Sequence, residues 1–97
     1  MERLSEIDFR EALAARKAGE RLSFVEKEIW DMDLSGTDLS NMDFTLSSFQ
    51  NTALNNVNLE NSSVENALFD GCSMKGANFK NAKMVTASFR YCDMRGC

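Results

Sequence analysis

The amino-acid sequence predicts an all-β solenoid, a four-sided parallel β-helix whose first coil is capped by an N-terminal α-helix. Three observations lead to this fold class. A large apolar residue stands at every fifth position of the last two-thirds of the chain, and asparagine or glycine follows most of these residues by two positions. Three of the apolar residues, Phe49, Phe69 and Phe89, are twenty residues apart, the period expected if four five-residue units complete one coil.

The five-residue repeat runs without interruption through the segment that we expect to form the solenoid. Its central positions are Leu34, Leu39, Phe44, Phe49, Leu54, Leu59, Val64, Phe69, Met74, Phe79, Met84, Phe89 and Met94. A period of five matches neither the 3.6-residue period of a helix nor the two-residue period of a strand. Asparagine and glycine favour turns, so we expect a corner in every unit and walls that stack about 4.8 Å apart.

A coil of four units places residues twenty apart on the same wall. The predicted core columns include Phe49, Phe69 and Phe89 on one wall and Leu34, Leu54 and Met74 on another. The same arithmetic places Cys72 directly below Cys92.

The stretches at 34–41 (LSGTDLSN) and 76–82 (GANFKNA) resemble the pentapeptide-repeat family, whose motif is small–(Asp/Asn)–(Leu/Phe)–polar–(Gly/Asn). The resemblance covers residues 32–96 and implies a right-handed quadrilateral β-helix. Ala53, Leu68 and Lys83 depart from the motif at the residue before the central one. These departures affect outward positions, so they bear on how the surface is used rather than on the fold.

We expect a single structural domain with two parts. Residues 1–31 form a capping helix and a leading segment, and residues 32–97 form a β-helix of about 3.25 coils at twenty residues per coil. Ser5 is a suitable N-cap for a helix that runs to about Ala18, with Gly19 as its stop. Phe24 and Ile29 already keep the five-residue phase, and we expect them to begin an imperfect first coil.

Composition limits the location and chemistry of the chain. No apolar run approaches the length of about 20 residues that a membrane span requires. The first residues do not resemble a signal peptide, so we expect a bacterial cytoplasmic protein, or one secreted as an effector. Three cysteines without any histidine suggest reduced thiols rather than a metal site or a disulfide framework. We expect no cofactor.

No arrangement of residues indicates catalysis, and we expect a protein that is not an enzyme. There is no histidine to act as a base, and no glycine-rich phosphate loop. A filled square prism also offers no cleft in which two carboxylates could share acid–base work.

Charge is segregated along the chain. The acidic belt is a set of six residues, three around each of two successive coils: Asp33, Asp38, Asp43, Glu60, Glu65 and Asp70. Basic residues are absent between Lys27 and Lys75 and frequent afterwards. Direct binding to nucleic acid is therefore not expected. In the resemblance, the belt implies an alternative function, a DNA mimic that binds gyrase, as quinolone-resistance members of the family do.

A second surface feature is a candidate partner patch of apolar residues at outward positions, made of Leu46, Leu68, Val85 and Tyr91. The coil period places the first three near one corner. With no catalytic signal, the leading hypothesis is a protein–protein interaction or scaffolding module. The stretch at 9–15 (FREALAA) followed by the repeat at 34–36 (LSG) also resembles pentapeptide modules attached to bacterial secretion-system accessory proteins and effectors, which implies an adaptor role.

The last repeat, residues 92–96, is followed by Cys97 alone, and three explanations stay open. The C-terminal edge could form a homodimer, the chain could be part of a longer protein, or a different protein could cover the edge. We expect the partner of this chain to be a protein, and its identity does not follow from the sequence.

Overall fold

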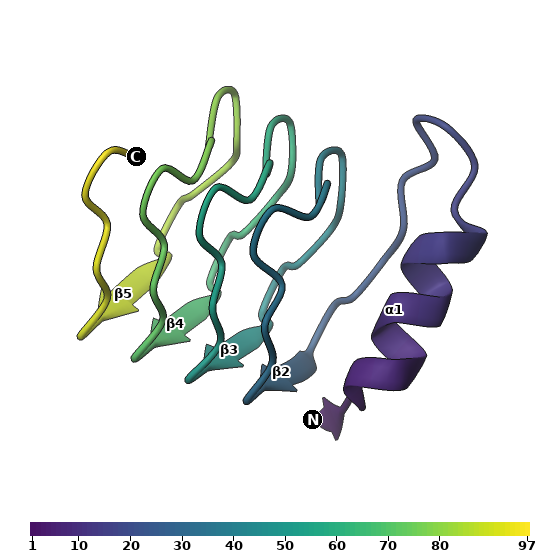
Figure 1. The fold of residues 1–97 in the computed structure, drawn as a ribbon, viewed down its shortest axis with the longest axis horizontal. Helices are drawn as coiled ribbons and strands as arrows, with labels where there is room; N and C mark the ends of the chain where they lie inside the picture. The colour runs from purple at the N-terminus through teal and green to yellow at the C-terminus, as the bar shows by residue number, and fades with distance from the viewer.

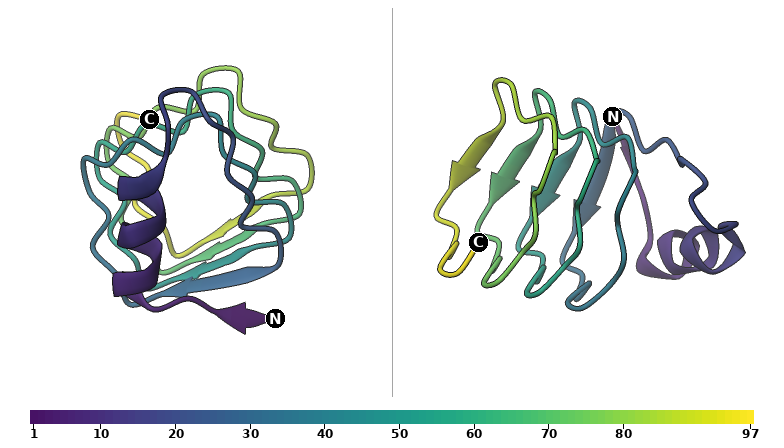
Figure 2. Two further views of the ribbon diagram at one scale, coloured as in Figure 1. Left: turned by 90° about the vertical axis from the view of Figure 1, so that its right-hand side faces the viewer. Right: turned by 90° about the horizontal axis from the view of Figure 1, so that it is seen from above.

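A computed structural model describes all 97 residues. Its elements are β1 (Glu2–Arg3), α1 (Glu6–Ala15), β2 (Lys27–Trp30), β3 (Ser48–Gln50), β4 (Leu68–Asp70) and β5 (Ser88–Arg90). The strands form one parallel sheet in the order β1-β2-β3-β4-β5, and the chain winds once around a square path between each strand and the next from β2 onward (Figures 1 and 2). The predicted fold class is confirmed.

The register of the walls is the feature that the twenty-residue period predicts. Phe49 pairs with Phe69 and Phe69 with Phe89 in the sheet. The other walls are joined by isolated parallel bridges, such as Asp38 with Asn58, at the same spacing. The three phenylalanine rings stack with centroids 4.7 and 4.8 Å apart. This separation equals the spacing of neighbouring strands, so the side chains and the backbone repeat together.

The corners explain the recurring asparagine and glycine. Each corner residue stands two positions after a central one and has a positive φ, as Asn41, Asn61 and Gly71 show. Asparagine and glycine adopt this left-handed conformation at lower cost than other residues. Gly71 has a second reason to lack a side chain, because a Cβ there would lie 2.7 Å from Oδ1 of Asn51 in the coil below.

The capping helix is shorter than predicted. It begins at Glu6, with Oγ of Ser5 accepting a hydrogen bond from Asp8 N–H, but it ends at Ala15 rather than near Ala18. Arg16 leaves the helical conformation, and its guanidinium donates to the carbonyl oxygens of Glu20 and Ser40, at 2.8 and 2.6 Å. These contacts with the following loop and the first coil replace the last predicted turn.

The solenoid begins inside the segment that was expected to lead into it. Ile29 pairs with Phe49 and Ser23 bridges to Asp43, so Phe24 and Ile29 do form part of a first coil. Strand β1 was not anticipated. It pairs with β2 and adds an outer strand to the sheet before α1 crosses the N-terminal end (Figure 2).

The core is a continuous column of apolar side chains inside the coils. Phe9 of α1 joins it and is completely buried. Towards the last coil burial decreases, and Phe79, Met84, Phe89 and Met94 are only partly buried. The one helix, α1, is neither long enough nor apolar enough to cross a membrane.

Candidate protein-interaction surface

Four corner residues break the rule that the corners favour asparagine, aspartate or glycine. Glu26, Leu46, Thr86 and Tyr91 all have φ between 54° and 62°. A left-handed backbone is uncommon for bulky side chains and is a genuine outlier for a β-branched residue such as threonine. These corners therefore carry local strain that asparagine would relieve.

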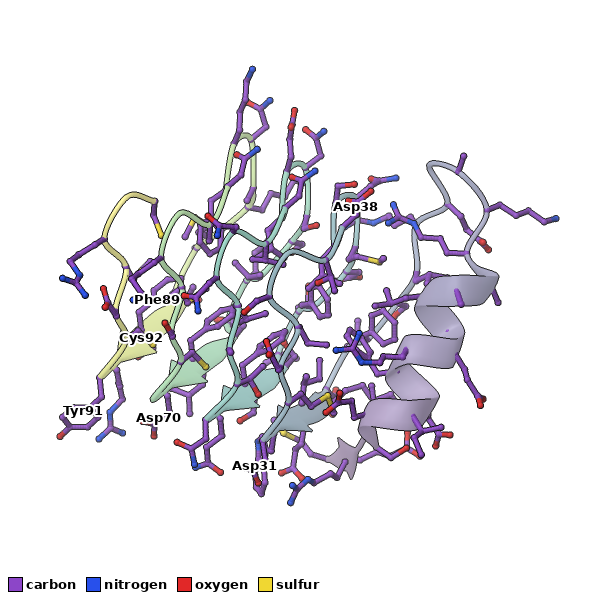
Figure 3. All side chains as sticks on the ribbon, in the orientation of Figure 1. Asp31, Asp38, Asp70, Phe89, Tyr91 and Cys92 are labelled. Atoms are coloured by element: carbon purple, nitrogen blue, oxygen red, sulfur yellow. The ribbon has the colours of Figure 1, made fainter.

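All four strained corners lie around the wall that carries the regular sheet, because Glu26 precedes β2 in the same corner column as Leu46 and Thr86. Thr86 precedes β5 and Tyr91, labelled in Figure 3, follows it, so they stand at the two ends of the same strand. Leu46 precedes β3, two coils below Thr86 in the same corner column. Tyr91 is 84% exposed, Val85 next to Thr86 is 67% exposed, and Leu46 is 41% exposed. The outer side of β2–β5 is thus flanked by apolar corners on both sides.

The structure divides the candidate partner patch. Leu46 and Val85 lie at one corner of the wall, whereas Tyr91 lies at the opposite corner, with the guanidinium of Arg90 5.8 Å from its ring centroid. Leu68 is only half-exposed, because it lies in β4 between β3 and β5. The sequence analysis missed Thr86, although a threonine in a slot that asparagine or glycine usually fills was a signal that could have identified it.

Two columns of side chains cover the outer surface between these corners. The first holds Glu28, Ser48, Leu68 and Ser88, and the second holds Trp30, Gln50, Asp70 and Arg90. Trp30 lies at the N-terminal edge, where its Nε1–H donates to Oγ of Ser48 and the guanidinium of Arg3 packs over its ring. Tryptophan, tyrosine and arginine are enriched in protein–protein interfaces, and this wall and its corners carry all three.

The first three carboxylates of the acidic belt are partly used inside the fold. Oδ1 of Asp33, Asp38 and Asp43 accepts the backbone N–H of the residue two positions later, at 3.0 to 3.1 Å. Hydrogen bonds from Ser35 lower the pKa of Asp33, and those from Ser40 lower the pKa of Asp38. Burial acts to raise the pKa of Asp43, but hydrogen bonds from Thr45 bring it below its ordinary value. These carboxylates hold turns as well as carrying charge.

Two of the remaining belt residues, Glu60 and Asp70, lie one coil below basic residues without forming ion pairs with them. Asp70 is in register with Arg90 in the sheet, and Lys80 lies above Glu60, where its carbonyl accepts the N–H of Asn61. Glu65 lies below the apolar Val85. The four ion pairs of the structure are elsewhere: Arg3–Asp31, Arg10–Glu6, Lys27–Glu2 and Arg95–Asp93. The belt is bounded by cationic side chains on the last coil, which interrupts a continuous acidic surface.

Two shallow depressions lie at the seam between α1 and the first coil, and neither assembles catalytic groups. The larger, about 310 Å³, is lined by Arg10, Leu13, Ala14, Thr37 and Asp38. The only acid there is Asp38, which already accepts the Ser40 N–H. No group of three or more metal-ligating carboxylates or thiols is present.

Comparison with known families gives one clear match. Residues 31–97 match the family described as "Pentapeptide repeat region". Comparison with curated proteins gives no match.

Solved structures of the same architecture overlay on the chain. HetL, a pentapeptide repeat protein involved in heterocyst differentiation regulation from the cyanobacterium Nostoc sp. strain PCC 7120, gives a TM-score of 0.73 at 20% identity. The overlay covers 89% of this chain and 37% of HetL, so the chain spans little more than a third of that protein. Rfr23 from the cyanobacterium Cyanothece 51142 gives a TM-score of 0.52 at 17% identity, covering 74% and 63% of the two chains. At these identities the likeness shows the fold alone.

Proposed function

The chain belongs to the pentapeptide-repeat family, whose members are generally non-catalytic, and we propose that it is a protein-interaction module that binds its partner through the outer face of β2–β5. The contact surface is the outer side of this wall together with the corners at Leu46, Val85–Thr86 and Tyr91. A rigid solenoid that presents such a wall serves as a scaffold or adaptor, because its shape does not depend on the partner.

The observation that carries this proposal is the strain at the corners. A non-glycine residue held in the left-handed region costs of order 1–3 kcal/mol, and such outliers tend to cluster at functional sites. Asn51 stands two coils below Tyr91 and Asn66 one coil above Leu46 in the same corner columns, so the fold accepts asparagine there. Leu46 and Tyr91 thus expose apolar surface where a cheaper residue is available, and that surface is useful to a binding site.

The test separates stability from binding. Leu46→Asn and Tyr91→Asn should each raise the thermal midpoint, because asparagine adopts the corner conformation more readily. The same variants should retain less of a partner that the unmodified chain captures from a lysate of the source cell. Lys80→Ala, on another wall, is the matched control and should bind normally. Variants that are more stable and bind as well as the unmodified chain would refute the proposed surface.

The homodimer through the C-terminal edge stays a prediction of its own. Light scattering after size exclusion, under reducing conditions and at low and high salt, measures it directly. Such a dimer would bring Arg90 and Arg95 near their own copies, so it should tighten as salt screens their repulsion.

The DNA-mimic alternative has weaker support. A DNA mimic needs an unbroken acidic surface, whereas Asp33, Asp38 and Asp43 take part in turns and the last coil is basic. A supercoiling assay with gyrase, with and without a quinolone, tests it, and protection of gyrase by this chain would favour the alternative over the β2–β5 surface.

A further inference from the structure

Two cysteines occupy equivalent places in the last two coils. Cys72 is completely buried, and Cys92, twenty residues later and labelled in Figure 3, is partly buried. The backbones at these positions are joined by a hydrogen bond of 3.1 Å from Asp93 N–H to the carbonyl of Cys72. No other residue stands between them, so one cysteine lies directly on the other.

Each thiol reaches toward the coil below its own. Sγ of Cys72 lies 3.5 Å from the carbonyl oxygen of Phe49, and Sγ of Cys92 lies 3.4 Å from the equivalent carbonyl of Phe69, so the Cys92 thiol lies against the coil that contains Cys72. Burial raises the pKa of the Cys72 thiol to about 11, with the nearby Cys92 thiol a smaller cause in the same direction. Stacked strands are about 4.8 Å apart, inside the range of about 4.4–6.8 Å between Cα atoms that disulfides span, and a disulfide also brings the two Cβ atoms to about 3.5–4.5 Å. The bond therefore requires the Cys72 side chain to rotate toward Cys92 and the last coil to move slightly toward the one below it.

We propose that Cys72 and Cys92 form a disulfide when the protein meets a peroxide oxidant, and that this bond ties the last coil to the one below it. The bond closes a loop over residues 72–92. That loop contains Val85, Thr86 and Tyr91, the exposed and strained residues of the last coil. The inference does not depend on whether those residues bind a partner.

The chemistry is a two-step oxidation of two thiols. The sulfur of Cys92, the more accessible of the two, attacks one oxygen of hydrogen peroxide; an S–O bond forms, the O–O bond breaks, and hydroxide leaves as water after taking the thiol proton. The sulfur of Cys72 then attacks the sulfenic sulfur of Cys92. The S–S bond forms, the S–O bond breaks, and the departing hydroxide takes the Cys72 proton to give a second water.

The exposed Cys97 must be removed for a clean experiment, because it could form bonds between molecules. In the Cys97→Ser chain, exposure to hydrogen peroxide should remove both titratable thiols and lower the mass by two hydrogen atoms. Peptide mapping without reductant should link Cys72 to Cys92 within one molecule. The thermal midpoint should rise by several degrees and return when dithiothreitol is added, because closing a loop restricts the unfolded chain.

The matched control is Cys72→Ser in the same background. Serine fits this slot, since Ser62 occupies the equivalent position two walls earlier and donates to the carbonyl of Leu39 at 2.7 Å. This variant should keep the fold and lose both the cross-link and the shift in midpoint. Two free thiols after peroxide treatment, or a sulfinic acid at Cys92 with Cys72 still free, would overturn the proposal. None of these measurements depends on partner binding, so the disulfide is tested separately from the proposed function.

Discussion

The core side chains are more deeply buried at the N-terminal end of the solenoid than at the C-terminal end. At the N-terminal end, Phe9 of α1 is fully buried, with its ring centroid 4.8 Å from that of Phe24, and Phe24 stacks on Phe44 at 5.4 Å. In the last coil, Phe89 stacks on Phe69 with the same regularity as the rings below it, yet it is only partly buried. Regular stacking alone therefore does not bury a residue, because each layer also needs a neighbour on its other side.

The N-terminal end is closed by groups that replace a coil rather than by another coil. Arg10 donates to the backbone carbonyl of Asp33, and Arg16 donates to that of Ser40 at 2.6 Å. The N–H of Leu4 donates to the carbonyl of Glu28 at 2.9 Å. Each carbonyl belongs to the first coil, so the cap supplies the donors that a preceding coil would have supplied.

The largest expected effect is the loss of a ring from the middle of the stack. Phe69→Ala should lower the free energy of unfolding by about 3–5 kcal/mol, because Phe69 is fully buried between two coils. Phe89→Ala, in the partly exposed last coil, should cost clearly less. Urea unfolding of both variants measures the difference. Equal losses would mean that the last coil is as well packed as the middle one.

The second-largest loss of stability should come from weakening the contact between the capping helix and the core. Phe9→Ala removes the side chain that joins α1 to the core and should cost about 3 kcal/mol, at the low end for a buried phenylalanine, because a helix at the end of the rod can settle into the space. Ile7→Ala is the control on the same helix, since Ile7 is 71% exposed and should change stability little. Thermal melts of the two variants test whether α1 stabilises the solenoid through Phe9.

The repeat allowed most of the solenoid to be predicted, since every unit repeats the same inward and corner positions. The register of Phe49 with Phe69 follows from the period alone. The limits of α1 did not follow, because its end depends on where the Arg16 guanidinium finds carbonyl partners in the first coil. Strand β1 was missed for a similar reason: two residues carry no periodicity, and their pairing with β2 is a tertiary contact.

The candidate surface was only partly predictable. The sequence identified Leu46, Val85 and Tyr91 as apolar residues in polar slots, and each is exposed. The coil period separated Tyr91 from the other three residues of the candidate partner patch, but it could not show that Leu68 is half-covered by its neighbours in the sheet. The backbone strain at Thr86 also required the dihedral angles.

A smaller effect should distinguish two buried serines at equivalent inward positions. Oγ of Ser62 donates to the carbonyl of Leu39 and accepts the N–H of Met42, whereas Oγ of Ser47 is buried without any hydrogen-bond partner. Ser62→Ala should therefore cost about 1–3 kcal/mol.

Ser47→Ala should be neutral or stabilising, because it removes an unsatisfied buried hydroxyl. Each variant loses the same hydroxyl group relative to the parent chain, so the effect of side-chain size is the same in both. Chemical denaturation of both variants provides the measurement. A comparable loss for Ser47→Ala would show that its hydroxyl has a partner in solution.

The smallest expected effect is on stability at low pH, and it follows from a comparison of three residues in one column of the solenoid. Asp38, Asn58 and Asn78 are twenty residues apart, and each side-chain oxygen accepts the N–H two residues later, at 3.0, 3.0 and 2.9 Å. Hydrogen bonds from Ser40 hold the pKa of Asp38 below the ordinary value of 3.8, so its contribution to stability is complete above that value. This contribution is lost as the pH falls through the lower folded-state pKa.

The variant Asp38→Asn should keep the turn, because the two asparagines above it make the same hydrogen bond, but its side chain cannot titrate. The variant should match the parent chain near pH 7 to within a few tenths of a kcal/mol and lose less stability between pH 4 and pH 2. Thermal midpoints measured across that interval decide the matter, and parallel curves for the two proteins would mean that the Asp38 carboxylate gains nothing from its hydrogen bonds in the fold.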